Sequence, residues 1–293
     1  MSVSFESQSD VHASVAAALS YLVPNDGERP VSYAYEPPAG VPWESGTYER
    51  RAMRIADARL FAAPPSIDRE GFELRDAPTS VRNFLDEDEV KRVYYVEAAE
   101  LALTVTGASR AYVFDHLARR REPAHVALSF GRRSTNGVAA ANGRIHNDYT
   151  EASGRSRLQR VFDAHGIPDE AADVRRYAIV NVWRSIRGVV LDTPLAVCDS
   201  RSVMSTDLIE SEVRYPRRTG EIYVACHSPL HRWAYFSQMD RHEALVFKQY
   251  DAQASGVARY TLHSAFDHPF APPGTPPRES IELRCLVVYD NHV

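Results

Sequence analysis

Residues 177–183 read Tyr-Ala-Ile-Val-Asn-Val-Trp, and at this stretch the pattern of the chain changes. Before it, the clearest segments carry apolar residues at helical spacing. From it onward, apolar residues fall in short runs that turn residues separate, which is typical of β-strands. We expect further strands at residues 221–225, 233–236, 244–250, 258–263 and 280–289. Many short strands in succession predict a β-sandwich or barrel in the C-terminal two thirds of the chain.

Two helices are expected before this region, packed on its outside. Residues 87–106 place apolar side chains among charged ones, and Gly107 is the expected stop. Residues 156–164 have an apolar face, and Gly166 is the expected stop. Between the two helices, apolar runs predict strands at residues 110–114 and 124–130.

The first 85 residues lack a clear pattern apart from a strand-like piece at residues 31–35. Either an arm or a lid is compatible with them. No segment has the composition of a linker between domains. We therefore predict a single domain over residues 1–293, with an irregular part at residues 1–85 and helices plus a β-core at residues 86–293.

Composition narrows the class of protein. The chain has 293 residues, 44% of them hydrophobic and 25% charged, so it can bury a large core. A net charge of −5 argues against nucleic acid or an anionic membrane as a partner. No apolar run is long enough to span a bilayer, and the first residues lack the pattern of a secretory signal. Three cysteines without metal-binding spacing predict reduced thiols and a cytoplasmic location.

Three residues are candidate metal ligands. His146 and Asp148 are two apart, so on a strand both would point to one face. His263 is expected on the next-to-last strand. Two imidazoles and one carboxylate suit Fe(II) and leave coordination positions open. The alternatives are a surface pair on a turn for the first two residues and a buried histidine for the third. His227 and His231 are rivals of His263 as the third ligand.

Arg278 and Ser280 are a candidate carboxylate site at the start of the last strand. On a strand they share a face, and a guanidinium binds a carboxylate through two parallel hydrogen bonds. This arrangement suits the distal carboxylate of a small dicarboxylic acid. The alternative is a solvated arginine after a proline-rich loop.

Further side chains are candidates for a substrate or co-substrate pocket. Arg184 is expected to pair with a carboxylate, either of a ligand or of the protein itself. Trp183 is expected to line an apolar pocket or to belong to the core. Tyr149, directly after the His-x-Asp motif, and His231 complete this group.

The order of these motifs resembles that of the Fe(II)/2-oxoglutarate-dependent oxygenases. The closest resemblance is to the family that contains the cephamycin-pathway hydroxylase component and fungal gibberellin desaturase. It covers the chain from about residue 100 to the end, and the matching segments are residues 106–116, 145–150, 179–184, 194–199, 215–221, 231–233, 263–267 and 276–282.

This resemblance implies a double-stranded β-helix, or jelly roll, with helices on its flanks. It implies that His146, Asp148 and His263 bind Fe(II), while Arg278 with Ser280 binds 2-oxoglutarate. The family often has Gln where this chain has Tyr149, so the phenol is expected to reshape the pocket. In the family the position of His231 can be Gln, which favours His263 as the third ligand.

The function that follows is an oxygenase that uses 2-oxoglutarate and O2 to hydroxylate or desaturate a small organic molecule in specialised metabolism. A redox-silent jelly-roll protein that binds a small molecule is the alternative. A hydrolase with a Ser or Cys nucleophile is disfavoured, because the chain lacks a G-x-S-x-G motif, and it has no P-loop.

Overall fold

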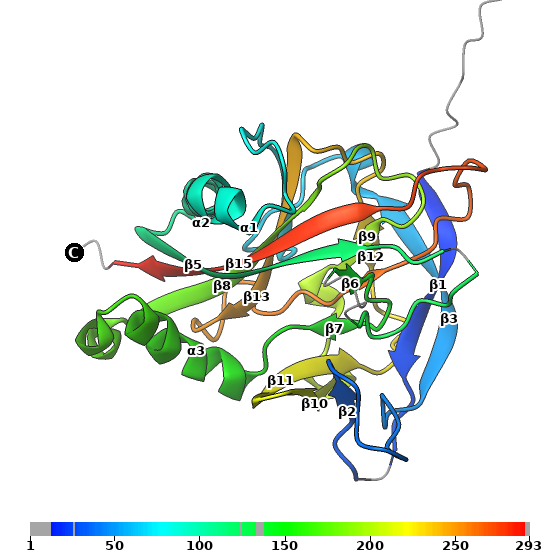
Figure 1. Cartoon of the computed structure of the whole chain (residues 1–293), viewed down its shortest axis with the longest axis horizontal. Helices are drawn as coiled ribbons and strands as arrows, with labels where there is room; N and C mark the ends of the chain where they lie inside the picture. The colour runs from blue at the N-terminus through cyan, green and yellow to red at the C-terminus, as the bar shows by residue number, and fades with distance from the viewer. Residues whose placement is uncertain (1–12, 26, 124, 133–137, 291–293) are drawn as a thin grey trace, which may run out of the picture.

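The computed structural model describes residues 13–25, 27–123, 125–132 and 138–290. Two β-sheets face each other and form most of the molecule, with the helices outside them (Figure 1). The larger sheet contains β1 (Ser14–Leu22), β2 (Val31–Tyr33), β3 (Tyr48–Asp57), β7 (His146–Asn147), β9 (Leu195–Cys198), β10 (Leu208–Tyr215), β11 (Arg218–Ala225), β12 (Trp233–Tyr235) and β14 (His263–Ala265). The smaller contains β4 (Phe72–Asp76), β5 (Arg110–Arg120), β6 (Ala139–Ala140), β8 (Arg176–Ser185), β13 (Glu243–Asp251) and β15 (Glu279–Tyr289).

Within the described residues, the larger sheet has the strand order β1-β3-β12-β9-β14-β7-β11-β10-β2 and the smaller has β4-β13-β8-β15-β5-β6. Many neighbouring strands come from distant parts of the chain, as β7 and β14 do, and most pairs are antiparallel. The fold is a jelly roll, as the family resemblance implied. Among the described residues, none of the helices has the length and apolar character of a membrane span.

The expected helix at residues 87–106 is confirmed. It runs through α1 (Glu87–Glu89), the π-helical turn η2 (Val90–Tyr94) and α2 (Tyr95–Thr106), and ends at Gly107, whose φ is 67°. The second helix, α3 (Glu151–Ala164), begins five residues before the expected start. Thr150 accepts a hydrogen bond from the Ser153 amide, and the Ser153 side chain accepts one from the Thr150 amide, which fixes the first turn. The described residues also contain four short 3₁₀ turns: η1 (Ala58–Leu60), η3 (Pro168–Asp173), η4 (Ser200–Ser202) and η5 (Ser205–Asp207).

The two faces of the smaller sheet carry different kinds of side chain. On the outer face, apolar residues such as Val180 and Val182 of β8 and Leu283 of β15 pack against α2. On the inner face, which looks toward the larger sheet, Asn181 and Arg284 bring polar groups into the space between the sheets. Because side chains alternate along a strand, one strand supplies both the core and the lining of a site.

Three sequence expectations were wrong. Residues 14–22 and 48–57 are not irregular, because β1 and β3 pair along their whole length and form the edge of the larger sheet. Residues 258–262 do not form a strand, because their polar groups bond elsewhere; the Thr261 amide, for example, donates to the Asn147 side chain. Residues 125–130 form turns and bends with one isolated bridge, because the chain turns at Pro123.

Candidate active site

Strand pairing places two histidines side by side. His146 of β7 and His263 of β14 are direct register partners, and their ring centroids lie 4.1 Å apart. Asp148 directly follows β7. One ligand atom from each of these three residues can be chosen so that all lie within 4.8 Å of one another. Residues 117 positions apart in the sequence therefore form one potential metal site.

The backbone sets the orientation of both imidazoles. His146 Nδ1 lies 2.8 Å from the Arg144 carbonyl oxygen, and His263 Nδ1 lies 3.2 Å from the Thr261 carbonyl oxygen. A carbonyl oxygen only accepts hydrogen bonds, so each Nδ1 carries the hydrogen and each Nε2 keeps a lone pair for a metal. Burial and the neighbouring His146 lower the pKa of His263 to about 3, which keeps it in the neutral, ligating form.

Asp148 links the two sheets. Its Oδ2 accepts hydrogen bonds from Asn181 Nδ2 at 2.9 Å and from Arg284 Nε at 2.8 Å, both on the smaller sheet. Its Oδ1 faces the imidazoles, 3.5 Å from His146 Nε2. Burial raises the pKa of Asp148, but Arg284 and the histidines outweigh burial and hold it well below its usual range. The carboxylate is thus ionised, with one oxygen anchored and one available.

A small inner cavity of about 10 Å³ lies against the histidines and Arg278. The guanidinium of Arg278 lies 5.6 Å from the centroid of the Trp183 ring, and its Nη1 donates to the Thr193 carbonyl oxygen. Among the described residues, neither Arg278 Nε nor Ser280 Oγ has a hydrogen-bond partner, although both atoms are buried. Burial and the nearby Arg119 lower the pKa of Arg278 to about 10, so the guanidinium stays charged at neutral pH. Two buried donors without an acceptor match a ligand carboxylate.

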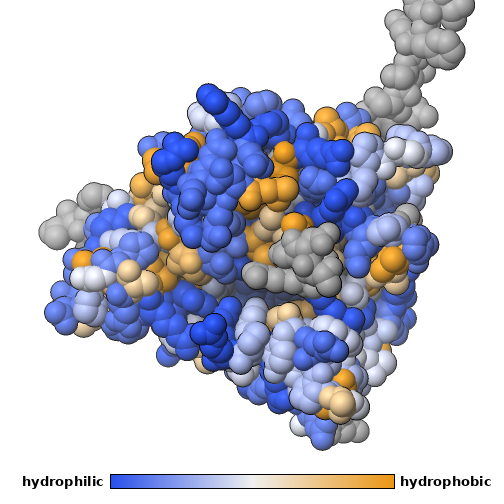
Figure 2. Space-filling model, in the orientation of Figure 1, coloured by the Kyte–Doolittle hydropathy of each residue, from blue (hydrophilic) through white to orange (hydrophobic). Residues whose placement is uncertain are grey.

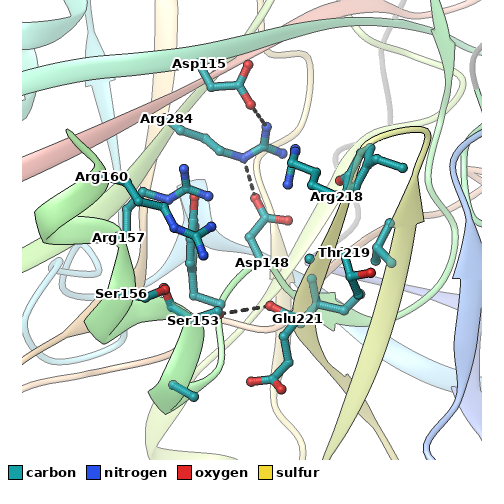
Figure 3. Close-up of a pocket in the computed structure, with 16 residues that line it drawn as sticks. Asp115, Asp148, Ser153, Ser156, Arg157, Arg160, Arg218, Thr219, Glu221 and Arg284 are labelled. Atoms are coloured by element: carbon teal, nitrogen blue, oxygen red, sulfur yellow. Dashed lines mark hydrogen bonds and ion pairs between the residues drawn. The ribbon is translucent and has the colours of Figure 1, made fainter. Parts of the chain in front are cut away.

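A larger outer cavity of about 260 Å³ lies beside Asp148, between α3 and the β10–β11 hairpin (Figure 3). Tyr149 and Arg284 also line it. Asp148 contributes to this cavity, while His146 and His263 line the inner one. The candidate metal site therefore lies where the two cavities approach each other.

Two sequence candidates lie outside both cavities. Arg184 points to the outer face of β8, where it donates to the Tyr94 hydroxyl and to two backbone carbonyls, so it stabilises the contact with the helix. His231 is hydrogen-bonded to the Tyr21 hydroxyl and to Asp207. Burial lowers the pKa of His231. The expectation that Arg184 and His231 line the pocket is corrected by these contacts, whereas Tyr149 and Trp183 do line cavities.

Several polar residues of the site were not among those predicted from the sequence. Asn181 and Arg284 hold Asp148, while Glu282 and Arg119 line the inner cavity. A signal for three of them exists in the sequence. Glu282 and Arg284 follow Ser280 at intervals of two in an apolar strand, and Asn181 precedes Trp183 by two. A polar row on one face of a buried strand indicates a site rather than a core.

Comparison with known proteins agrees with this geometry. Residues 19–288 match the family described as oxidoreductase/YMDC permease-like domain. The hydroxylase/desaturase efuI of Hormonema carpetanum is 34% identical over 83% of this chain and 85% of its own length. The alpha-ketoglutarate-dependent dioxygenase phiK of a fungal species is 31% identical over 94% of this chain and 96% of its own. A solved structure of the iron and alpha-ketoglutarate-dependent endoperoxidase NvfI superposes with a TM-score of 0.82 at 24% identity, over 95% of this chain and 99% of that one.

A jelly roll with two histidines and one carboxylate between its sheets defines the class of mononuclear non-haem iron oxygenases. The chain belongs to the family described as oxidoreductase/YMDC permease-like domain. It is an Fe(II)/2-oxoglutarate-dependent dioxygenase related to fungal hydroxylase/desaturases. The donor set fits this cofactor, because N,O ligands suit Fe(II), and because Arg278 Nε and Ser280 Oγ, which have no partner among the described residues, suit the co-substrate carboxylate.

Proposed function

We propose that His146, Asp148 and His263 bind Fe(II), and that Arg278 with Ser280 binds the distal carboxylate of 2-oxoglutarate. The observation that carries the proposal is the three-residue cluster, with its ligand atoms within 4.8 Å of one another, beside two buried donors for which the described part of the chain offers no acceptor. The outer cavity then holds the small organic molecule that is hydroxylated or desaturated. Tyr149 on its wall is part of the substrate pocket.

The protein's own residues prepare the site for this reaction. When bound, iron and 2-oxoglutarate would supply, together with O2, the oxidising power to hydroxylate or desaturate the substrate at a C–H bond. In the same reaction 2-oxoglutarate becomes succinate and CO2. Arg284 and Asn181 fix one oxygen of Asp148, and the carbonyls of Arg144 and Thr261 fix the imidazoles. Prearranged ligands need no reorganisation when the metal binds.

The test of the proposal is succinate formation from 2-oxoglutarate with Fe(II), O2 and ascorbate. His146→Ala, Asp148→Ala and His263→Ala are each expected to abolish it and to remove Fe(II) binding in calorimetry, while circular dichroism stays that of the wild type. His231→Gln, outside both cavities, is the matched control. Retained turnover in His263→Ala, with loss in His231→Gln, would refute the ligand assignment.

We also propose that residues 1–293 act as one domain in the cytoplasm, on a small-molecule substrate and without a nucleic-acid or membrane partner. The three cysteines are free thiols, which suits a reducing compartment. The net charge of −5 gives no electrostatic attraction to a polyanion. Fractionation of the cells that make the protein tests the location.

A further inference from the structure

The wall of the outer cavity is rich in arginine. Arg157 and Arg160 come from α3, Arg218 comes from β11 and Arg284 comes from β15. Figure 3 shows the two α3 arginines on one side of Asp148 and Arg218 on the other. Guanidinium groups therefore flank the cavity on opposite walls.

Every acidic residue of this wall already has a basic partner. Asp115 and Asp148 pair with Arg284 at 3.0 and 2.8 Å, and Glu221 pairs with Arg29 at 2.7 Å. The reverse is not true of the arginines. Among the described residues, no carboxylate lies within 4.0 Å of the guanidinium of Arg157, Arg160 or Arg218, so these three arginines carry uncompensated positive charge.

Aromatic rings hold two of these arginines in place. The guanidinium of Arg157 lies 5.0 Å from the ring centroid of Phe114 and 5.4 Å from that of Tyr149, and Arg218 lies 3.8 Å from that of Tyr215. A ring attracts a guanidinium through its face and leaves the N–H groups at its edge free to donate. Accordingly, Arg157 Nε is buried without a hydrogen-bond partner in the described part of the chain.

We infer that the substrate of this oxygenase carries a carboxylate, and that Arg157, Arg160 and Arg218 bind it in the outer cavity. Arg157 and Arg160 are three residues apart on a helix and therefore face one ligand together. Planar guanidinium groups match a carboxylate through paired hydrogen bonds. A molecule anchored there extends toward Asp148, where the proposed iron lies. The inference rests on the proposed function, since it names the substrate class of that same site.

The test uses benzoate, 1-naphthoate and 4-phenylbutyrate as probes, each beside its primary amide, which has nearly the same shape but no charge. Calorimetry measures their binding to the full chain with Mn(II) and 2-oxoglutarate, because Mn(II) prevents turnover. At least one acid is expected to bind with a Kd below about 1 mM and at least tenfold more tightly than its amide. Inorganic sulfate is expected to compete with it.

The variant Arg160→Gln/Arg218→Gln changes two exposed residues and is expected to weaken acid binding about tenfold to hundredfold. Arg157→Lys keeps the charge of a partly buried residue and is expected to weaken it less. Arg155→Gln, on the same helix but outside the cavity, is the matched control and is expected to leave acid binding unchanged.

Three results would overturn the inference. They are equal affinity for acids and amides, absence of binding by all three acids, and unchanged acid affinity in Arg160→Gln/Arg218→Gln. In the third case, a loss of 2-oxoglutarate affinity in the double variant would show that the arginines bind the co-substrate. Failure of the wild type to bind Mn(II) or 2-oxoglutarate refutes the proposed function, and the acid-against-amide comparison in the metal-free protein then decides the inference separately.

Discussion

Arg284 Nε donates a hydrogen bond of 2.8 Å to Asp148 Oδ2, so a residue of one sheet holds the carboxylate that the other sheet presents to the histidines. The same guanidinium also contacts Asp115 and Glu282, each at 3.0 Å. These contacts hold Arg284 in one position. Burial lowers the pKa of Arg284, but the neighbouring carboxylates outweigh burial and keep it well above the usual value. Asp148 is therefore fixed before any metal binds.

Arg284→Gln is expected to lower metal affinity about tenfold to hundredfold, the usual effect of losing a residue that orients a ligand. Titration with Mn(II), followed by calorimetry, measures this change. Arg187→Gln is the matched control, because Arg187 pairs with Glu279 at the surface. Equal Mn(II) affinity in Arg284→Gln and the wild type would show that Asn181 alone orients Asp148.

Arg278→Lys is expected to raise the Kd for 2-oxoglutarate about tenfold to hundredfold, because lysine cannot donate two parallel hydrogen bonds. Ser280→Ala is expected to act in the same direction but more weakly. Metal affinity is expected to stay near that of the wild type in both variants. Calorimetric titration of 2-oxoglutarate in the presence of Mn(II) measures these effects.

Two variants are controls for this carboxylate site. Glu279→Gln changes a residue that contacts Arg120 and Arg187 outside the cavity, so it is expected to be silent. Arg184→Lys is expected to lower stability through its lost contacts with Tyr94, without changing 2-oxoglutarate affinity. A large loss of 2-oxoglutarate affinity in Arg184→Lys, with none in Arg278→Lys, would place the binding site of the 2-oxoglutarate carboxylate on β8 instead of at the start of β15.

Gly154→Ala is expected to lower the free energy of unfolding by about 1–3 kcal/mol. This loss is expected although alanine is more favourable than glycine inside a helix by about 1 kcal/mol. The reason is a close approach of α3 to β13. A Cβ at residue 154 would lie 2.4 Å from a ring carbon of Tyr250. Urea denaturation measures the change. Gly188→Ala, where a Cβ meets nothing within 4 Å, is expected to be neutral, and equal stability of the two variants would contradict the packing argument.

Glu151→Gln is expected to destabilise the protein at neutral pH and progressively less in acid. Burial raises the pKa of Glu151, but hydrogen bonds from Arg155, Tyr260 and Arg259 outweigh burial and lower it to about 2. Since the folded pKa lies below the unfolded value of 4.5, this stabilisation is complete above pH 4.5 and is lost as the pH falls toward 2.

Urea denaturation of Glu151→Gln and the wild type over the range from neutral pH down to acid measures that difference. Glu170→Gln, which removes an exposed pair with Arg110, is the control and is expected to change stability little. A difference between Glu151→Gln and the wild type that stays constant over the whole range would refute the assigned role of the carboxylate.

Local patterns singled out His146 and His263 as candidate ligands and predicted about half of the strands of the jelly roll, namely β2, β5, β8, β11, β12, β13 and β15. They could not reveal β1 and β3, because the Ala-rich segment Ser14–Leu22 becomes a strand through pairing with residues 48–57. They also extended β14 too far, since residues 258–262 use their backbone groups outside the ladder.

The candidate site was predictable to a similar extent. The spacing of His146 and Asp148 and the order of the motifs indicated the candidate metal site, because metal-binding residue types can be recognised in the sequence. The arginines of the outer cavity were not predictable, because α3 and β11 are brought together only by the fold. Arg184 was placed wrongly since a buried arginine can serve a helix contact as well as a ligand.

Figure 2 shows that polar side chains dominate the visible surface, whereas His146 and His263 are buried in the interior. There, His146 and His263 are paired across β7 and β14, which are among the shortest strands of the larger sheet. Insertion or deletion of one residue in either strand would turn its histidine to the opposite face. Length variation among relatives should therefore fall in the loops, while these two short strands keep a constant length.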